Sequence, residues 1–221
     1  MRQVPEEWKC AVISPIFKGG RKDCQDPTNY RPISLTLCVA RVMEKLLNKQ
    51  VLKYLRGNSL LCDQQSGFLP HHSTMTQLCL LTHRWQLALD KRDSIETAFL
   101  DLSKAYDRVT IPGLIYKLSL YGFSRAAIEW FSAFLTNRQQ RARVMNDHYS
   151  PWETTKSGIP QGTVLGPVLF LIFINDLPQS LSGDCAIFAD DTTAFSIGRK
   201  TKDICEKLTL DLDAAFDWAT T

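Results

Sequence analysis

The sequence AIFADDTTAF, residues 186–195, places two adjacent carboxylates between two apolar segments that are rich in β-forming residues. These segments predict two paired strands, with Asp190 and Asp191 at the tip of a tight hairpin. Aspartate is ordinary in a turn, because its short side chain accepts hydrogen bonds from nearby backbone amides. From these residues alone, a structural turn is the simplest interpretation.

A third carboxylate suggests that the acids of the hairpin could have a catalytic role. Asp101 ends another apolar run, TAFLD at residues 97–101. If this strand lies beside the hairpin in one sheet, three acids gather at one edge, where like charges raise one another's pKa. Mg²⁺ relieves this conflict because it binds carboxylate oxygens, water and substrate phosphates. Two such ions about 4 Å apart can stabilise both the attacking and the leaving oxygen of a phosphoryl displacement. The acids thus predict metal-dependent phosphoryl or nucleotidyl transfer, provided that Asp101 meets the hairpin.

The composition is that of an ordinary soluble protein, large enough at 221 residues to bury a substantial core. The net charge of +3 attracts polyanions only weakly, so any nucleic-acid contact must depend on local clusters. The seven cysteines form no C-x-x-C pair and predict reduced thiols in an intracellular protein of the nucleus or cytoplasm. We expect neither a signal peptide nor a membrane segment, because the longest apolar run, residues 164–174, is too short to span a bilayer.

Apolar residues at helical spacing predict helices near residues 37–56 and 73–91. We expect both apolar stripes to face the core. The stripes consist of Val39, Val42, Met43, Leu46, Leu47, Val51, Leu52 and Leu55, and of Met75, Leu78, Leu81, Trp85 and Leu89. The loop between the helices carries His71 and His72, but adjacent histidines do not converge as helical i, i+4 metal ligands do.

The remaining segments mix strands and helices without a regular βαβ alternation, which favours an α+β fold with helices packed on one face of an antiparallel sheet. The expected elements are a strand at 10–17, helices near 112–121 and 124–135, a hairpin around Asn146 and Asp147, and helices near 165–177 and 204–219. Two basic groups stay open to interpretation, either as phosphate contacts or as solvated surface. They are Lys18, Arg21, Lys22 and Arg31, and Arg138, Arg141 and Arg143.

Four segments resemble, in order, the motifs of reverse transcriptases, and especially those of non-LTR (LINE-type) retrotransposons. They are NYRPISL (29–35), FLDLSKAYDRV (99–109), GIPQGTVLGP (158–167) and FADD (188–191). The resemblance implies a right-hand polymerase with an antiparallel palm sheet packed on helices. Residues 1–95 would be a fingers-type region, and residues 96–221 the palm, interrupted by a segment near 110–160. The chain would end before the thumb, which would then be absent.

The resemblance also implies the metal-binding residues. Asp101, Asp190 and Asp191 would be the catalytic acids, with Asp191 in a lesser, supporting role. The backbone carbonyl of Leu102 would be a further metal ligand. The expected cofactor is a pair of Mg²⁺ ions, for which Mn²⁺ could substitute.

Nucleotide contacts follow from the same resemblance. Lys18 and Arg31 match residues that hold the incoming triphosphate, and Gln161 and Gly162 match the loop that lines the nucleotide and template pocket. Tyr106 matches the aromatic residue that crowds the 2′ position of the sugar. A bulky ring there excludes ribonucleotides, because the 2′-OH is what distinguishes them from deoxynucleotides.

The function implied is an RNA-directed DNA polymerase, in which a DNA primer on an RNA template receives deoxynucleotides from their triphosphates. One alternative is a retroelement remnant that binds nucleic acid without turnover, suggested by the missing thumb. A second is an RNA-templated RNA polymerase palm. The identities of Tyr106 and Ala189 argue against this alternative. The sequence departs from the family at Leu69 and His72, where the family usually or often has basic residues.

Overall fold

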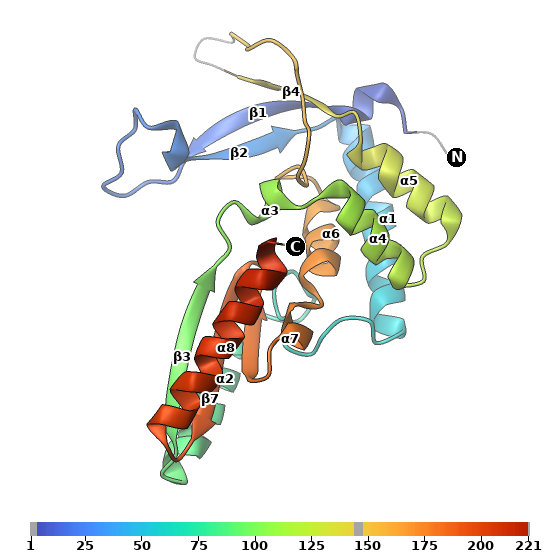
Figure 1. Cartoon of the computed structure of the whole chain (residues 1–221). Coiled ribbons are helices and arrows are strands. Elements are labelled where there is room, and N and C mark those ends of the chain that lie inside the picture. The colour runs from blue at the N-terminus through green and yellow to red at the C-terminus, as the bar shows by residue number, and fades with distance from the viewer. Residues whose placement is uncertain (1–3, 144–147, 221) are drawn as a thin grey trace. The chain divides into compact units, whose positions relative to one another are not determined.

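The computed structural model of the chain describes residues 4–143 and 148–220. The chain divides into two compact units, each built from two segments (Figure 1). Unit 1 consists of Met1–Leu55 and Tyr106–Ile172, and unit 2 of Arg56–Ala105 and Phe173–Thr221. Each unit contains helices and one β-sheet, which confirms the expected α+β class.

Unit 1 contains a four-stranded sheet in the order β2-β1-β4-β5. Its strands are β1 (Cys10–Phe17), β2 (Tyr30–Leu35), β4 (Gln139–Ala142) and β5 (Glu153–Thr154). The β1–β2 and β4–β5 pairs are antiparallel, but β1 and β4 are parallel. The expectation of an antiparallel sheet is therefore wrong for this pair, whose strands come from distant segments and give no local hairpin signal.

The hairpin expected around Asn146 and Asp147 is present as the antiparallel strands β4 and β5. Arg143 and Tyr149 form one further antiparallel bridge toward the turn. The turn itself, with the two residues on which the hairpin was predicted, lies outside the described residues.

The helices of unit 1 agree with the sequence periodicity. They pack around fully buried side chains such as Leu114 and Phe134, and α5 begins after Ser124, whose hydroxyl accepts a hydrogen bond from the amide of Ala127. The regular segments are η1 (Glu6–Lys9), η2 (Pro27–Asn29), α1 (Cys38–Gly57), α3 (Ala105–Arg108), α4 (Ile111–Leu120), α5 (Arg125–Leu135) and α6 (Gly166–Ile174).

Unit 2 contains an antiparallel sheet in the order β3-β7-β6. The strands are β3 (Ser94–Asp101), β6 (Asp184–Phe188) and β7 (Asp191–Gly198). The helices are α2 (Thr74–Asp90), α7 (Leu177–Ser180) and α8 (Thr201–Thr220). The helix expected near 165–177 thus ends at Ile174, and the short α7 follows it as a separate element.

Helices cover both faces of the unit 2 sheet rather than one. In Figure 1, α8 lies in front of β3 and β7, and α2 lies behind them. Phe195 of β7 meets the ring of Trp85 on α2 at a centroid distance of 6.0 Å. The next residue, Ser196, points to the opposite face, because successive side chains of a strand alternate. The central strand is therefore buried on both faces from Ala194 to Ser196.

The expectation that the apolar stripes of α1 and α2 face the core is wrong for much of their length. Among the stripe residues, Val39 is 66% exposed and Met75 is 68% exposed. The buried side of α1 instead includes the charged residue Glu44, which is 2% exposed. Helical spacing predicted both helices but not which side of each is buried. The other exposed stripe residues include Val42, Leu46, Leu78 and Leu89.

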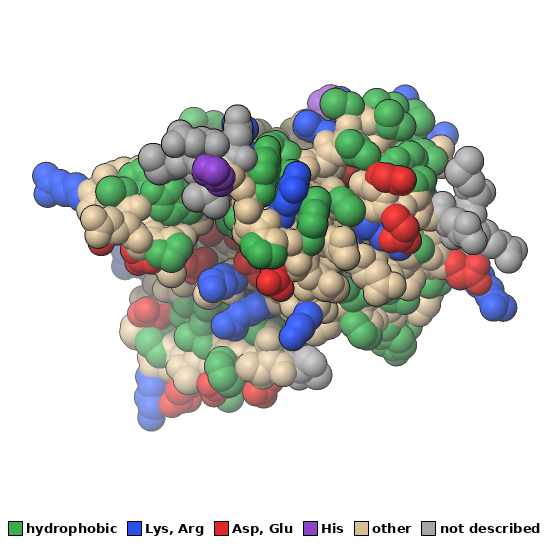
Figure 2. All heavy atoms as spheres, turned by 90° about the horizontal axis from the view of Figure 1, so that it is seen from above, with side chains coloured by type: hydrophobic (Ala, Val, Ile, Leu, Met, Phe, Trp, Pro, Cys, Tyr) green, Lys and Arg blue, Asp and Glu red, His purple; other side chains and the backbone are tan. Residues whose placement is uncertain are grey.

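Charged side chains are interspersed on the face drawn in Figure 2, where Lys and Arg lie among Asp and Glu. This mixture is consistent with the small net charge of +3. Within the described residues, no helix combines the length and the apolar character needed to cross a bilayer.

Candidate active site

The acidic hairpin of unit 2 forms where the sequence placed it, with a shift of one residue. Phe188 pairs with Asp191 across β6 and β7, which leaves Ala189 and Asp190 as the two turn residues. Asp191 is therefore the first residue of β7 rather than part of the tip. Ala189 has a φ of +60°, as the primed turns of two-residue hairpins require.

Asp101 meets this hairpin through the pairing of β3 with β7. The antiparallel register sets Asp101 directly opposite Asp191. Directly opposed residues project to the same face of a sheet, so these two carboxylates lie on one face, next to the turn that carries Asp190. The pairing thus brings Asp101 next to the hairpin that carries Asp190 and Asp191, although Asp101 is far from them in the sequence.

The electrostatics of Asp190 reflect this crowding. Burial raises the pKa of the Asp190 carboxyl above its ordinary value, and the charges of Asp191 and Asp101 raise it further. A hydrogen bond from its own backbone amide partly offsets this rise. The mutual repulsion expected from three nearby acids is therefore present.

The donor set fits a hard divalent cation, because Mg²⁺ prefers carboxylate and carbonyl oxygens. Within the described residues, however, no three His, Cys, Asp or Glu side chains converge tightly enough to form a metal centre. The carbonyl of Leu102 accepts a hydrogen bond from the amide of Ala105 at 3.0 Å. A carbonyl oxygen has two lone pairs, so this bond leaves acceptor capacity for a cation.

In unit 1, Lys18 and Arg31 lie on the β1–β2 hairpin. Arg31 pairs with Ile16, and the amide of Lys18 donates to the carbonyl of Asn29 at 2.9 Å, which extends the ladder by one residue. Alternation along the strands therefore puts both basic side chains on one face, and both are exposed. The Lys18 ammonium donates to the Thr28 carbonyl at 2.8 Å.

The loop at residues 157–162 is docked on α3 and β2. The amide of Ile159 donates to the carbonyl of Tyr106 at 2.8 Å, and the carbonyl of Gln161 accepts from the amide of Ser34 at 2.8 Å. Gly162 has a φ of +89°, in the region that favours glycine, and a Cβ there would lie 3.1 Å from a methyl carbon of Ile33. This part of the loop therefore depends on a glycine.

A second glycine brings the loop close to α3. Gly158 has a φ of +89°, and a Cβ at this position would lie 2.9 Å from Cα of Asp107. Tyr106, which precedes Asp107, stacks on the buried ring of Phe170 with a centroid distance of 4.8 Å and an interplanar angle of 11°. The stacking holds the tyrosine ring in one plane.

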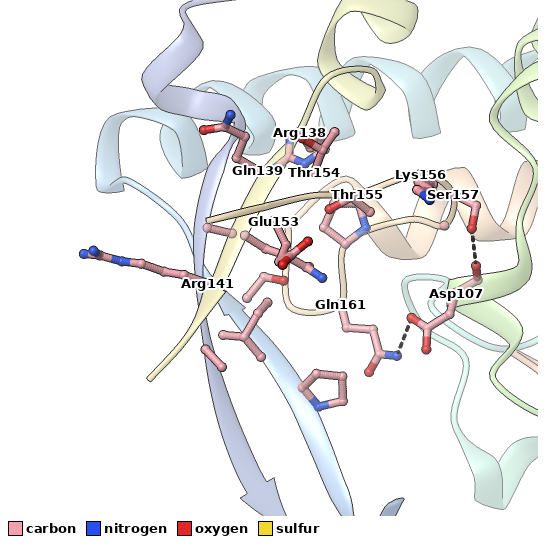
Figure 3. A pocket seen from close by; sticks show the side chains of 18 of the residues that line it. Asp107, Arg138, Gln139, Arg141, Glu153, Thr154, Thr155, Lys156, Ser157 and Gln161 are labelled. Carbon is pink, nitrogen blue, oxygen red and sulfur yellow. Dashed lines mark hydrogen bonds between the residues drawn. The ribbon is translucent and has the colours of Figure 1, made fainter. Parts of the chain in front are cut away.

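A cavity of about 520 Å³ lies between this loop and the sheet of unit 1. Figure 3 shows the amide of Gln161 pointing toward Asp107, to which it donates at 3.3 Å. The side chain of Arg141 extends away from the cavity, and its guanidinium stacks on the rings of Tyr149 and Trp152. The cavity is lined by polar groups from β4, β5 and the loop, and by apolar residues that include Ala11, Ile13 and Ile159.

Arg138, which the sequence left open between a phosphate contact and a solvated edge, is buried with 2% of its surface exposed. Its guanidinium donates to the carbonyl of Phe134 at 3.0 Å and lies 4.9 Å from the centre of that ring. Burial lowers the pKa of Arg138, and the carboxylate of Glu44 acts in the opposite direction. Its contacts are those of a residue in the core of unit 1.

Residues 18–220 match the reverse transcriptase (RNA-dependent DNA polymerase) family. The chain belongs to the reverse transcriptase family. It is 34% identical over 174 residues to a probable RNA-directed DNA polymerase from transposon BS of Drosophila melanogaster, covering 79% of this chain and 19% of that protein. It is 31% identical over 223 residues to the RNA-directed DNA polymerase from mobile element jockey of the same species, covering 97% of this chain and 24% of that protein. These relatives confirm the predicted link to non-LTR retrotransposons.

The fold has solved counterparts. The apo telomerase of Candida tropicalis truncated from its C-terminal domain superposes with a TM-score of 0.66 at 13% identity, covering 96% of this chain and 48% of that chain. At this identity the match shows a shared fold. The chain spans about a fifth of the length of the transposon BS polymerase.

Several residues that shape this reverse transcriptase domain carried no signal in the sequence. Glu44 accepts hydrogen bonds from the amides of Val164 at 2.7 Å and Leu165 at 3.0 Å, just before α6 begins. Gln65 contacts the acidic hairpin through its side chain. A charged or amide residue within an apolar stripe or loop gives no indication of its distant partner, so periodicity could not reveal these contacts.

Proposed function

We propose that this reverse transcriptase domain extends a DNA primer along an RNA template by adding deoxynucleotides. The observation that carries the proposal is the register that sets Asp101 opposite Asp191, beside the turn that holds Asp190. Membership of the family supplies the reaction class. The 3′-OH of the primer attacks the α-phosphate of the incoming nucleotide, and pyrophosphate leaves.

Asp101, Asp190 and Asp191, together with the carbonyl of Leu102, would hold two Mg²⁺ or Mn²⁺ ions. Such ions act as Lewis acids that stabilise the attacking and leaving oxygens of the displacement. Burial, and then the charges of Asp191 and Asp101, raise the pKa of Asp190, and a bound cation would offset the repulsion between the carboxylates. Asp190 would contribute most and Asp191 would support it.

The residues of unit 1 would bind the nucleotide. Lys18 and Arg31 would hold the triphosphate by charge-assisted hydrogen bonds, and their exposure on one face of the β1–β2 hairpin supports this role. Gln161 and Gly162 would line the nucleotide and template pocket. Tyr106 would exclude ribonucleotides by crowding the 2′ position, and its stacking on a buried ring supports a fixed orientation.

In the terms of a right-hand polymerase, we assign residues 1–95 to a fingers-type region and residues 96–221 to the palm, with an interruption near 110–160. The β1–β2 hairpin with its basic residues supports the first assignment. The acid-bearing antiparallel sheet β3-β7-β6 supports the second. The proposed partners are an RNA template, a DNA primer and deoxynucleoside triphosphates.

A primer-extension assay tests the catalytic proposal. We expect Asp190→Asn to lower extension at least about 100-fold, since even the loss of a residue that only hydrogen-bonds to a metal ligand costs up to about 100-fold. Asp213→Asn is the matched control, because Asp213 is exposed on α8. Equal extension by the wild type and Asp190→Asn would refute the proposal. Template binding by the wild type without extension would favour a protein that binds nucleic acid without turnover.

A further inference from the structure

A short loop segment of unit 2 runs along the acidic hairpin. The amide of Ile187 on β6 donates to the carbonyl of Gln64 at 2.8 Å, and the amide of Ser66 donates to the carbonyl of Ile187 at 2.8 Å. These bonds form a parallel bridge between Gln65 and Ile187. The segment therefore pairs with the outer edge of β6, which is otherwise an edge strand of the sheet.

The side chain of Gln65 continues this pairing onto the turn itself. Its Oε1 accepts hydrogen bonds from the amides of Ala189 at 3.0 Å and Gly67 at 2.6 Å. Its Nε2 donates to the carbonyl of Ala189 at 3.4 Å. One side-chain amide thus serves both backbone polar groups of Ala189, in the manner of a neighbouring strand.

These bonds meet a need created by burial. Ala189 is 5% exposed, and as a turn residue it has no partner in the β6–β7 ladder. Buried backbone groups need hydrogen-bond partners, and Gln65, itself 2% exposed, supplies them. The φ of +60° at Ala189 is unfavourable for a residue with a side chain and persists where the surroundings hold it.

Gly67 adds a steric contact on the same turn. A Cβ at Gly67 would overlap the backbone nitrogen of Ala189 and would lie 2.9 Å from the carbonyl carbon of Phe188. Because both contacts are with backbone atoms, a larger residue would have to move the turn. Asp190 follows Ala189 directly, so a movement of Ala189 displaces the Asp190 carboxylate.

We propose that Gln65 and Gly67 are positioning residues for the catalytic hairpin. They hold the backbone of Ala189, and thereby keep the Asp190 carboxylate in place beside Asp101 and Asp191. This inference rests on the proposed polymerase function. It assigns a role to Gln65 and Gly67, for which the sequence predicted only a place in the loop between two helices.

The test compares Gln65→Leu with the wild type. Leucine is close to glutamine in size but removes all three hydrogen bonds. We expect the Ala189 amide to exchange with solvent deuterium at least about 10-fold faster, because the turn can then open locally without having to break these hydrogen bonds. We also expect kcat for nucleotide addition to fall at least about 10-fold, with a higher Mg²⁺ requirement and little change in KM for the nucleotide.

Two further variants separate positioning from a general loss of structure. Gln77→Leu removes a second buried glutamine of the same unit and should leave exchange at Ala189 and the Mg²⁺ requirement unchanged. Gln65→Glu keeps an acceptor oxygen for the amides of Ala189 and Gly67. It should therefore restore part of the protection and activity that Gln65→Leu loses. If Gln65→Leu does not fold, Gln65→Glu should still exchange faster at Ala189 than the wild type, because it lacks the donor to the Ala189 carbonyl.

Unchanged exchange at Ala189 in Gln65→Leu would overturn the inference. Faster exchange with unchanged kcat and Mg²⁺ requirement would also overturn it, because the turn would then move without consequence for catalysis. If the wild type does not extend a primer, the proposed function fails by itself. Exchange at Ala189 then decides alone whether Gln65 holds the turn.

Discussion

Asp211 on α8 offers a quantitative test of how unit 2 is held together. It is 2% exposed, and its carboxylate accepts three hydrogen bonds from the segment between α7 and β6. Oδ1 accepts from the amide and hydroxyl of Ser182 at 2.7 and 2.8 Å, and Oδ2 accepts from the amide of Gly183 at 3.0 Å. The change considered is Asp211→Ala, which removes all three bonds at once.

The cost of this change follows from the bonds it removes. Hydrogen bonds to a charged group contribute about 1.5–3 kcal/mol each. The two backbone amides cannot rotate toward other acceptors, so the loss of their bonds dominates the cost. Ser182 is exposed, so water replaces part of its loss. We therefore expect Asp211→Ala to lower the free energy of unfolding by about 3 kcal/mol.

Urea unfolding followed by tryptophan fluorescence measures this effect, because Trp85 and Trp218 belong to unit 2. With a urea slope of about 1–3 kcal/mol/M, the midpoint should fall by about 1–3 M. Asp213→Ala on the same helix is the matched control, since Asp213 is exposed. A difference between the two variants below about 0.5 kcal/mol would refute the reasoning, because that is the usual range of surface substitutions.

Three further predictions concern other buried or crowded groups. Glu44→Gln removes the charge that accepts two amides before α6 and should cost about 1–3 kcal/mol in urea unfolding. Phe170→Leu removes the ring on which Tyr106 stacks; it should cost about 1 kcal/mol and lower the preference for deoxynucleotides over ribonucleotides in single-turnover incorporation. Folding raises the pKa of Asp190. At pH values between the ordinary and the raised pKa, the folded protein therefore binds more protons than the unfolded chain. Its free energy of unfolding falls as pH rises through this window. In EDTA, Asp190→Asn should therefore have a higher free energy of unfolding than the wild type at pH 7. This gain should disappear at a pH below the ordinary pKa of aspartate. An equal gain at pH 7 and at that low pH would contradict the prediction.

The acidic hairpin shows which features local sequence patterns could predict. The apolar, β-forming segments on either side of Asp190 and Asp191 were enough to predict two strands and a turn. The assignment of the turn residues moved by one, to Ala189 and Asp190, because the pairing of Phe188 with Asp191 defines the tip. Sequence alone favours aspartate over alanine in a turn with positive φ, and the contacts of Gln65 explain why alanine is held there.

Long-range pairing was the part that periodicity could not supply. The meeting of Asp101 with Asp191 was an assumption from the residues, and only the resemblance to a family made it an expectation. The parallel pairing of β1 with β4 was not foreseen, because neither strand encodes its partner in local sequence. Similarly, the apolar residues of α1 predicted a helix, but the buried carboxylate of Glu44 decides which part of that helix faces inward.

The interleaving of the two units has a consequence for synthesis on the ribosome. The β1 strand, complete at Phe17, pairs with β4, which begins only at Gln139. At about 5–20 residues per second, β1 and β2 must wait several seconds for this partner. Meanwhile the first segment of unit 2 emerges and in turn lacks β6 and β7. Unit 1 is completed by residue 172 and unit 2 only by α8, so until then the nascent chain presents open strand edges that could pair with other chains.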